Sequence, residues 1–171
     1  MSFFKNPPPS FEDPLGLLRA CHDRILHHCE TLERLAHHLE HAGANAEARQ
    51  TAARIRRYFQ VSGPAHHADE EEQLFPWLLA QTGFPDSLRT ILQELAAEHR
   101  ELDQMWQALD MELAQVEHGT AVNLHPDPFV SMSRIHIARE NGRIFPEAEK
   151  LLAPETRMVL GAEMEKRRRQ D

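Results

Sequence analysis

The sequence predicts an all-α protein, an up-down-up-down four-helix bundle with a short helix at the C-terminus. Only 7 of the 171 residues are glycine and 6% are aromatic, whereas 41% are hydrophobic, which suits helix packing better than a sheet sandwich. Apolar residues recur at alternating spacings of three and four over long segments. Short turn sequences separate these segments, as is typical of antiparallel neighbouring helices.

The length suits one domain with its own core. We expect a proline-rich N-terminal arm over residues 1–12, because prolines lack the N–H donors of a regular helix, and a single bundle domain over residues 13–171. The net charge of −8 argues against a general attraction to nucleic acid or to an anionic membrane. The sequence shows neither a signal-peptide pattern nor an apolar run of about 18 residues. We therefore expect a soluble cytoplasmic protein, with a homodimer as one option for its oligomeric state.

The first helix is predicted to begin at Asp13-Pro14, which supply an N-cap and a first-turn proline. Its inward positions are Leu15, Leu18, His22, Ile25, Cys29, Leu32, Ala36 and Leu39. A single histidine, His22, therefore stands in an otherwise mostly apolar series. The His-Ala-Gly-Ala-Asn sequence of residues 41–45 ends this helix.

The second helix is predicted over residues 46–80, with a kink or a short break at the Ser-Gly-Pro sequence of residues 62–64, since the proline would displace a backbone hydrogen bond. The third helix is expected to be capped by Asp86 or Ser87 and to end at His118-Gly119. It has the clearest periodicity, with inward positions at Leu88, Leu92, Leu95, His99, Leu102, Trp106, Leu109, Leu113 and Val116. Again one histidine, His99, takes the place of an apolar residue.

The fourth helix is predicted from Phe129 to about Leu151, and Ala153-Pro154 stop it. A short last helix follows over about residues 155–166. It runs into the basic residues 166–169, which suit a helix C-terminus. We expect this basic run to be a solvated tail.

A histidine, a glutamate four residues later and a Phe-Pro pair occur twice, seventy residues apart. The first copy is residues 66–76 and the second is residues 136–146. Two matches in the same register indicate a repeated half. Because residues i and i+4 share one helix face, His66 and Glu70 should point the same way, and so should His136 and Glu140.

One histidine from each of four helices and one glutamate from two of them are therefore predicted to point inward: His22, His66, Glu70, His99, His136 and Glu140. Two carboxylates facing each other in a core would be costly without cations. We interpret the six as metal ligands, with both glutamates bridging two ions. His67 with Glu71 is an alternative register. Asp103 can be a ligand, an acceptor that orients His99, or a surface residue.

In this arrangement each ion receives two imidazoles and two carboxylate oxygens, and an oxo or hydroxo bridge adds a fifth ligand. Each ion then keeps one open position for a small molecule. Mixed nitrogen and oxygen donors with more than four ligands favour iron or manganese over structural zinc. We therefore predict two iron ions bridged by Glu70 and Glu140, with manganese or zinc as substitutes.

The pattern resembles the hemerythrin-like, or HHE cation-binding, family over residues 13–152. The matching elements are His22, the pair His66 and Glu70, and the Glu-Glu-Gln-Leu-Phe-Pro run of residues 71–76. Oxygen-carrying members have His-x3-His on the third helix and His-x4-Asp on the fourth, whereas here Asp103 follows His99 and Glu140 follows His136. Two His-x3-Glu arms with two lone histidines resemble more closely the di-iron proteins that repair iron centres.

The resemblance implies a non-haem di-iron protein that binds or reacts with O2 or NO, for sensing, storage or detoxification. An iron donor or store for the repair of damaged iron centres is the alternative, and a bundle that uses its metal only structurally is a third reading. No nucleophile or oxyanion motif accompanies the site. Whether the protein is an enzyme stays open.

Overall fold

The computed structural model describes residues 10–170, and these residues form helices, turns and loops without a strand. The helices are α1 (Pro14–Ala42), α2 (Ala46–Asp69), η1 (Glu70–Leu74), α3 (Phe75–Ala80), α4 (Asp86–Glu117), α5 (Asp127–Arg139), η2 (Glu140–Ile144), α6 (Phe145–Leu151) and α7 (Pro154–Gln170). The η segments are single π-helical turns. They join α2 to α3 and α5 to α6 without a break, so that each trio forms one long rod.

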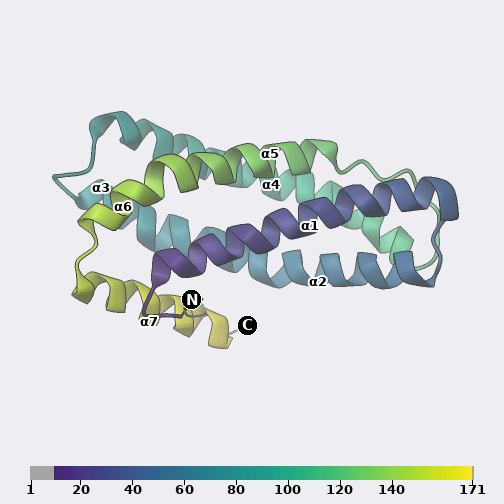
Figure 1. Ribbon diagram of the computed structural model, residues 1–171, viewed down its shortest axis with the longest axis horizontal. Helices are drawn as coiled ribbons and strands as arrows, with labels where there is room; N and C mark the ends of the chain where they lie inside the picture. Colours follow the sequence, from purple (N-terminus) through teal and green to yellow (C-terminus); the bar gives the residue numbers. More distant parts are fainter. Residues whose placement is uncertain (1–9, 171) are drawn as a thin grey trace, which may run out of the picture.

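Four rods lie side by side and form the bundle (Figure 1). The rod that begins with α2 packs against α1 and α4, and the rod that begins with α5 packs against the same two helices. Consecutive rods run in opposite directions (Figure 1). The helix α7 lies outside the bundle near one end, where it contacts α1 and α2. The predicted all-α four-helix bundle is confirmed.

The helix boundaries follow from local capping. The Asp13 carboxylate accepts a hydrogen bond from the Gly16 N–H at 3.0 Å, and the Asn45 side chain accepts one from the Ala48 N–H at 2.9 Å. Gly43 ends α1 with φ of 64°, a left-handed conformation that glycine adopts without a steric penalty. The first two predicted helix starts therefore lie where the caps indicated.

The short break, one of the two options expected at residues 62–64, is wrong, because α2 stays helical through Pro64 as far as Asp69. Phe59 and Ala65, on either side of this sequence, are both buried. Packing of the inward face therefore holds the helix across the backbone hydrogen bond that the proline removes.

The irregularities of these rods lie instead in η1 and η2. In each, a peptide N–H bonds to the carbonyl five residues earlier, from Phe75 to Glu70 and from Phe145 to Glu140. Each phenylalanine is followed by a proline, which has no N–H for the α-helical bond to the carbonyl four residues earlier. The repeated Phe-Pro pair thus accompanies a π turn that begins at each inward glutamate, and such turns are frequent at functional sites.

Two apolar clusters fill the bundle on either side of a polar layer. His22 lies between Leu18 of one cluster and Ile25 of the other, and His99 lies between Leu95 and Leu102 in the same way. The polar residues therefore occupy one level in the middle of the bundle, with apolar packing at both ends.

The helix α7 continues to Gln170, beyond the predicted end near residue 166, and its basic run contacts the bundle. Arg167 Nη1 and Arg168 Nη2 lie 2.7 and 2.6 Å from the two carboxylate oxygens of Asp69, which is fully buried beside Glu70. The expectation of a solvated tail is therefore wrong for these two arginines. They compensate a third buried carboxylate, in addition to Glu70 and Glu140, which helix periodicity alone did not reveal.

Residues 1–9 of the predicted N-terminal arm lie outside the described residues, and the assignment of residues 13–171 to a single domain stays a prediction. Phe11, in the described part of the arm, lies against α7, and a Cβ added to Gly161 would lie 1.7 Å from its carbonyl oxygen. Among residues 10–170, no helix is long and apolar enough to cross a membrane.

Candidate metal centre

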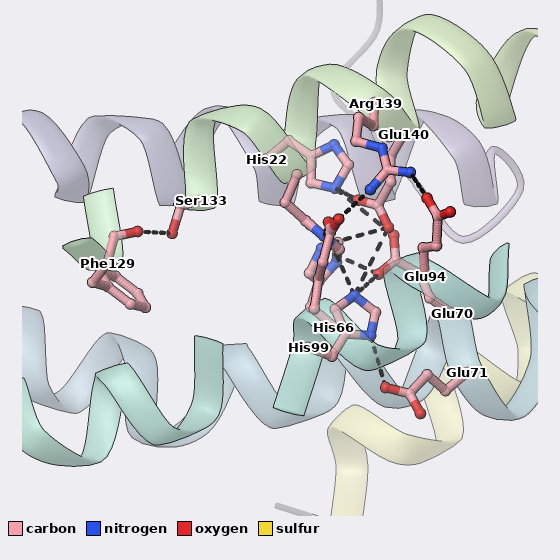
Figure 2. A network of polar contacts seen from close by, with 12 residues as sticks. His22, His66, Glu70, Glu71, Glu94, His99, Phe129, Ser133, Arg139 and Glu140 are labelled. Atoms are coloured by element: carbon pink, nitrogen blue, oxygen red, sulfur yellow. Dashed lines mark hydrogen bonds and ion pairs between the residues drawn. The ribbon is translucent and has the colours of Figure 1, made fainter. Parts of the chain in front are cut away.

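The six side chains singled out from the sequence converge at one level of the bundle (Figure 2). They come from six elements: His22 from α1, His66 from α2, Glu70 from η1, His99 from α4, His136 from α5 and Glu140 from η2. None is more than 3% exposed. The spacing of four residues within each arm therefore does bring a histidine and a glutamate to the same side of the rod.

Each glutamate contacts imidazoles with both of its oxygens. Glu140 Oε2 lies 3.1 Å from His22 Nε2, and its Oε1 lies 3.2 Å from His136 Nε2. Glu70 Oε1 lies 3.7 Å from His22 Nε2, and its Oε2 lies 3.4 Å from His99 Nε2. Each carboxylate therefore lies within 3.8 Å of three of the four imidazoles.

The cluster divides into two groups that could each hold a metal ion. His22 and His66 form one group with both glutamates, and His99 and His136 form the other with the same two glutamates. Within each group, one ligand atom from every residue lies within 4.8 Å of the others. The two groups share both carboxylates, so the arrangement can accommodate a pair of cations.

Buried polar atoms without a partner support this interpretation. Among the described residues, none of the four carboxylate oxygens of Glu70 and Glu140 takes part in a well-aligned hydrogen bond, and neither does His22 Nε2. Native proteins satisfy the large majority of such atoms. The donor set of imidazole nitrogens and carboxylate oxygens fits cations bound between them.

The electrostatics of the cluster also favour cations. Burial lowers the pKa of His22, but the carboxylates of Glu140 and Glu70 outweigh burial and raise it to about 10. The same opposition raises the pKa of His99 to about 9. Burial raises the pKa of Glu70 and Glu140, but the surrounding imidazoles hold both below the usual range. Both carboxylates are therefore kept ionised in the core, where they attract positive charge.

Three of the four imidazoles are oriented by a polar neighbour on the far side of the ring. His22 Nδ1 lies 2.9 Å from Asn141 Oδ1, and His99 Nδ1 lies 2.7 Å from Glu71 Oε1. His136 Nδ1 lies 2.8 Å from an oxygen of Glu98. Such acceptors fix the tautomer that leaves Nε2 available for a metal ion. Sequence reasoning missed all three acceptors in this role, although two of them directly follow an inward glutamate.

His66 is the exception. Its Nε2 lies 3.6 Å from Glu70 Oε2, but its Nδ1 has no hydrogen-bond partner among residues 10–170. Burial is the largest influence on this ring and lowers its pKa to about 3. His66 is therefore a neutral imidazole whose outer nitrogen is unused by the protein.

His67, Glu71 and Asp103, the residues of the alternative predictions, lie outside the two buried groups. The two buried groups contain the pair His66 and Glu70, whereas His67 stacks on the His99 ring at 4.0 Å and lies 3.3 Å from Asp103. The Asp103 side chain is 58% exposed, and Glu71, not Asp103, contacts His99 Nδ1. The structure therefore brings His66 and Glu70, not His67 and Glu71, into the buried groups, and it places Asp103 at the surface beside His67.

A third group of potential ligands, His37, Glu40 and His41, lies on the exposed face of α1. All three of its residues are exposed. It carries none of the buried, unpartnered atoms that distinguish the central cluster.

Residues 13–148 match the Hemerythrin HHE cation binding domain. The chain belongs to this family. A protein of Haemophilus influenzae that is described as uncharacterized is 28% identical over 162 residues, which cover 93% of this chain and 92% of that protein. Family membership and the buried histidine and glutamate groups both indicate metal binding. The chain is therefore a metal-binding protein of the hemerythrin family.

Proposed function

We propose that the six buried residues hold two iron ions and that the loaded protein binds or reacts with O2 or NO. The observation that carries the proposal is the set of unpartnered carboxylate oxygens of Glu70 and Glu140, enclosed by four imidazole Nε2 atoms. A buried charge without a partner costs several kcal/mol. Two such carboxylates in one core therefore need more than one positive charge close by.

In this proposal one ion is held by His22 and His66, the other by His99 and His136, and Glu70 and Glu140 bridge them. The two oxygens of Glu140, which face His22 and His136 at nearly equal distances, support bridging. Iron and manganese usually bind more than four ligands, so four protein ligands would leave coordination positions open. Structural zinc, in contrast, is complete with four ligands. When bound, a pair of ferrous ions supplies electrons and open coordination positions to a small diatomic molecule.

The protein's own contribution is to hold the imidazoles in place and to keep bulk water away. Asn141, Glu71 and Glu98 accept hydrogen bonds from three ring Nδ1–H groups and so point each Nε2 inward. The apolar clusters on either side exclude water and lower the local dielectric, which strengthens electrostatic interactions within the layer.

The alternative, an iron donor or store, is less well supported by the burial of the site. No proposed ligand is more than 3% exposed. Release of iron would therefore require several buried ligands to part from the ion inside the core, a local rearrangement with its own free-energy cost. Retention of the metal agrees better with repeated binding of a small ligand than with delivery of iron.

Metal analysis of aerobically purified protein, followed by anaerobic reduction and addition of O2 or NO, tests the proposal. We expect two iron ions per chain and a new visible absorption band when the gas is added. Iron that passes to a chelator without such a band would favour the donor or store. A protein that never takes up two equivalents of iron or manganese would overturn both.

A further inference from the structure

A cavity of about 270 Å³ lies beside the proposed metal site, within the larger of the two apolar clusters. Side chains from α1, α2, α4 and α5 line it. His66 and His136 form its inner end, and Gly63, Gln60 and Gln107 belong to its outer part. The cavity therefore leads from the bundle surface to one imidazole of each proposed metal group.

The cavity is much larger than a diatomic ligand requires. A molecule the size of water fills about 30 Å³, and a cavity of about 150 Å³ in another protein holds benzene. On that scale, the space can take an organic molecule of about ten non-hydrogen atoms. Access for O2 or NO alone would not need this volume.

The middle of the cavity is apolar. Phe59, Trp106 and Phe129 pack together there, with ring centroids 4.5 to 5.7 Å apart. The one hydroxyl in the lining, that of Ser133, is already used, because it donates to the Phe129 carbonyl at 2.8 Å (Figure 2). Water in this part of the cavity would find few partners, so an apolar group replaces it favourably.

The inner end offers one polar anchor. His66 lines the cavity, and its Nδ1 has no acceptor from the described part of the chain. If His66 Nε2 faces a metal ion, the neutral ring carries its proton on Nδ1, and a buried donor without an acceptor is unfavourable. This Nδ1 atom is closed to a water-sized molecule, so a ligand oxygen reaches and satisfies the donor only when the His66 ring turns slightly toward the cavity.

The surroundings select against an anionic ligand. The apolar middle offers no charge to pair with one, and the exposed carboxylate of Asp103 lies in the lining near the surface. The chain as a whole carries a net charge of −8. The favoured ligand is therefore uncharged, with an apolar body and a terminal oxygen.

From these observations we infer that the cavity is a binding site for an uncharged organic molecule of about ten non-hydrogen atoms, which places a terminal oxygen against His66 beside the metal pair. The inference deepens the proposed function and rests on it for the metal at the inner end. It makes an organic molecule, in addition to a diatomic gas, a ligand of this site.

Straight-chain alcohols from 1-butanol to 1-dodecanol are suitable probes for the zinc-loaded full chain. In a Trp77→Phe variant, Trp106 is the single remaining tryptophan and reports on the cavity by fluorescence. We expect saturable binding that tightens by up to about fourfold per added CH2 as far as 1-octanol and then levels off, because the cavity is full. The His66 ring N–H resonance should shift when 1-octanol binds.

Gly63 provides the blocking variant. A Cβ added there meets only Phe59 Cδ1, at 4.0 Å, so a larger side chain can enter the cavity without a backbone clash. We expect Gly63→Leu to weaken 1-octanol binding at least tenfold and Gly63→Ala to weaken it only slightly. Circular dichroism and the thermal midpoint of each variant establish that it is folded.

The inference is overturned if 1-octanol does not saturate, if affinity climbs steadily to 1-dodecanol, if the His66 resonance does not move, or if Gly63→Leu binds as tightly as the unaltered chain. Repeating the titration on metal-depleted protein separates this inference from the proposed function. The cavity should still bind 1-octanol there, so a failure to load two metal ions would leave the cavity result standing.

Discussion

The two arms, residues 66–76 and 136–146, have the same backbone and the same inward side chains but opposite charges around them. Each runs from a histidine through an inward glutamate into a π turn and a Phe-Pro pair. Glu71 and Asn141, which directly follow the inward glutamates, each contact the histidine of a neighbouring rod. The shared part of the repeat therefore sets the geometry of the cluster.

At the third position after the histidine, the two arms carry residues of opposite charge. Asp69 in the first arm pairs with Arg167 and Arg168 of α7, and Arg139 in the second arm pairs with Glu94 and Glu98 of α4. The charge of each arm is therefore compensated by whichever neighbouring helix carries the opposite charge. The charged residues outside the cluster differ between the two arms, whereas the inward histidine and glutamate occupy the same positions in both.

The largest expected effect comes from removing either shared carboxylate. Glu70→Ala and Glu140→Ala should each abolish two-metal loading, because both metal groups lose a ligand and the remaining carboxylate has fewer cations to attract. Metal analysis after reconstitution measures this. Glu72→Ala, which alters an exposed neighbour in the first arm, is the control and should keep two ions. Equal loss from all three variants would contradict the assigned register.

The next largest effect is on stability, and it should be greater for the first arm than for the second. Replacing Arg167 and Arg168 by alanine leaves Asp69 buried without a partner and should lower the free energy of unfolding by about 3 kcal/mol. Arg139→Ala should cost about 1 kcal/mol, because Glu94 is 53% exposed and water can solvate it, while Glu98 keeps its contact with His136 Nδ1 at 2.8 Å.

Urea unfolding of the metal-depleted variants measures both values. Arg169→Ala, at an exposed position of the same basic run, should leave stability unchanged. A larger loss of unfolding free energy in Arg139→Ala than in the Arg167 and Arg168 double variant would contradict this prediction.

The smallest effect should come from the residues that orient the imidazoles. Glu71→Ala and Asn141→Ala should each weaken metal binding by about 10- to 100-fold without changing the number of ions, since the imidazoles of His99 and His22 lose the acceptors that hold them. Competition with a chelator of known affinity measures this. Gly142→Ala adds a Cβ in open space next to Asn141 and should behave like the unaltered chain. Unchanged affinity in all three variants would show that burial alone orients the rings.

Much of the site could be predicted from the sequence because it depends on local helix geometry. The spacing of four residues places His66 with Glu70 and His136 with Glu140, and the inward series of the other two rods places His22 and His99. The π turns could not be predicted in this way. A Phe-Pro pair is compatible with several local structures, and the turn is stabilised by packing on both sides.

The four-helix bundle and the inward direction of the six polar residues follow from the order of amino acids, because helix periodicity is a local property of the chain. Which groups surround those six depends on how the helices pack against one another. The pairing of Asp69 with Arg167 and Arg168, the acceptors Glu71, Asn141 and Glu98, and the cavity beside His66 all depend on contacts between helices. Such contacts join residues far apart in sequence, and their geometry follows from how the rods pack, which no local pattern records.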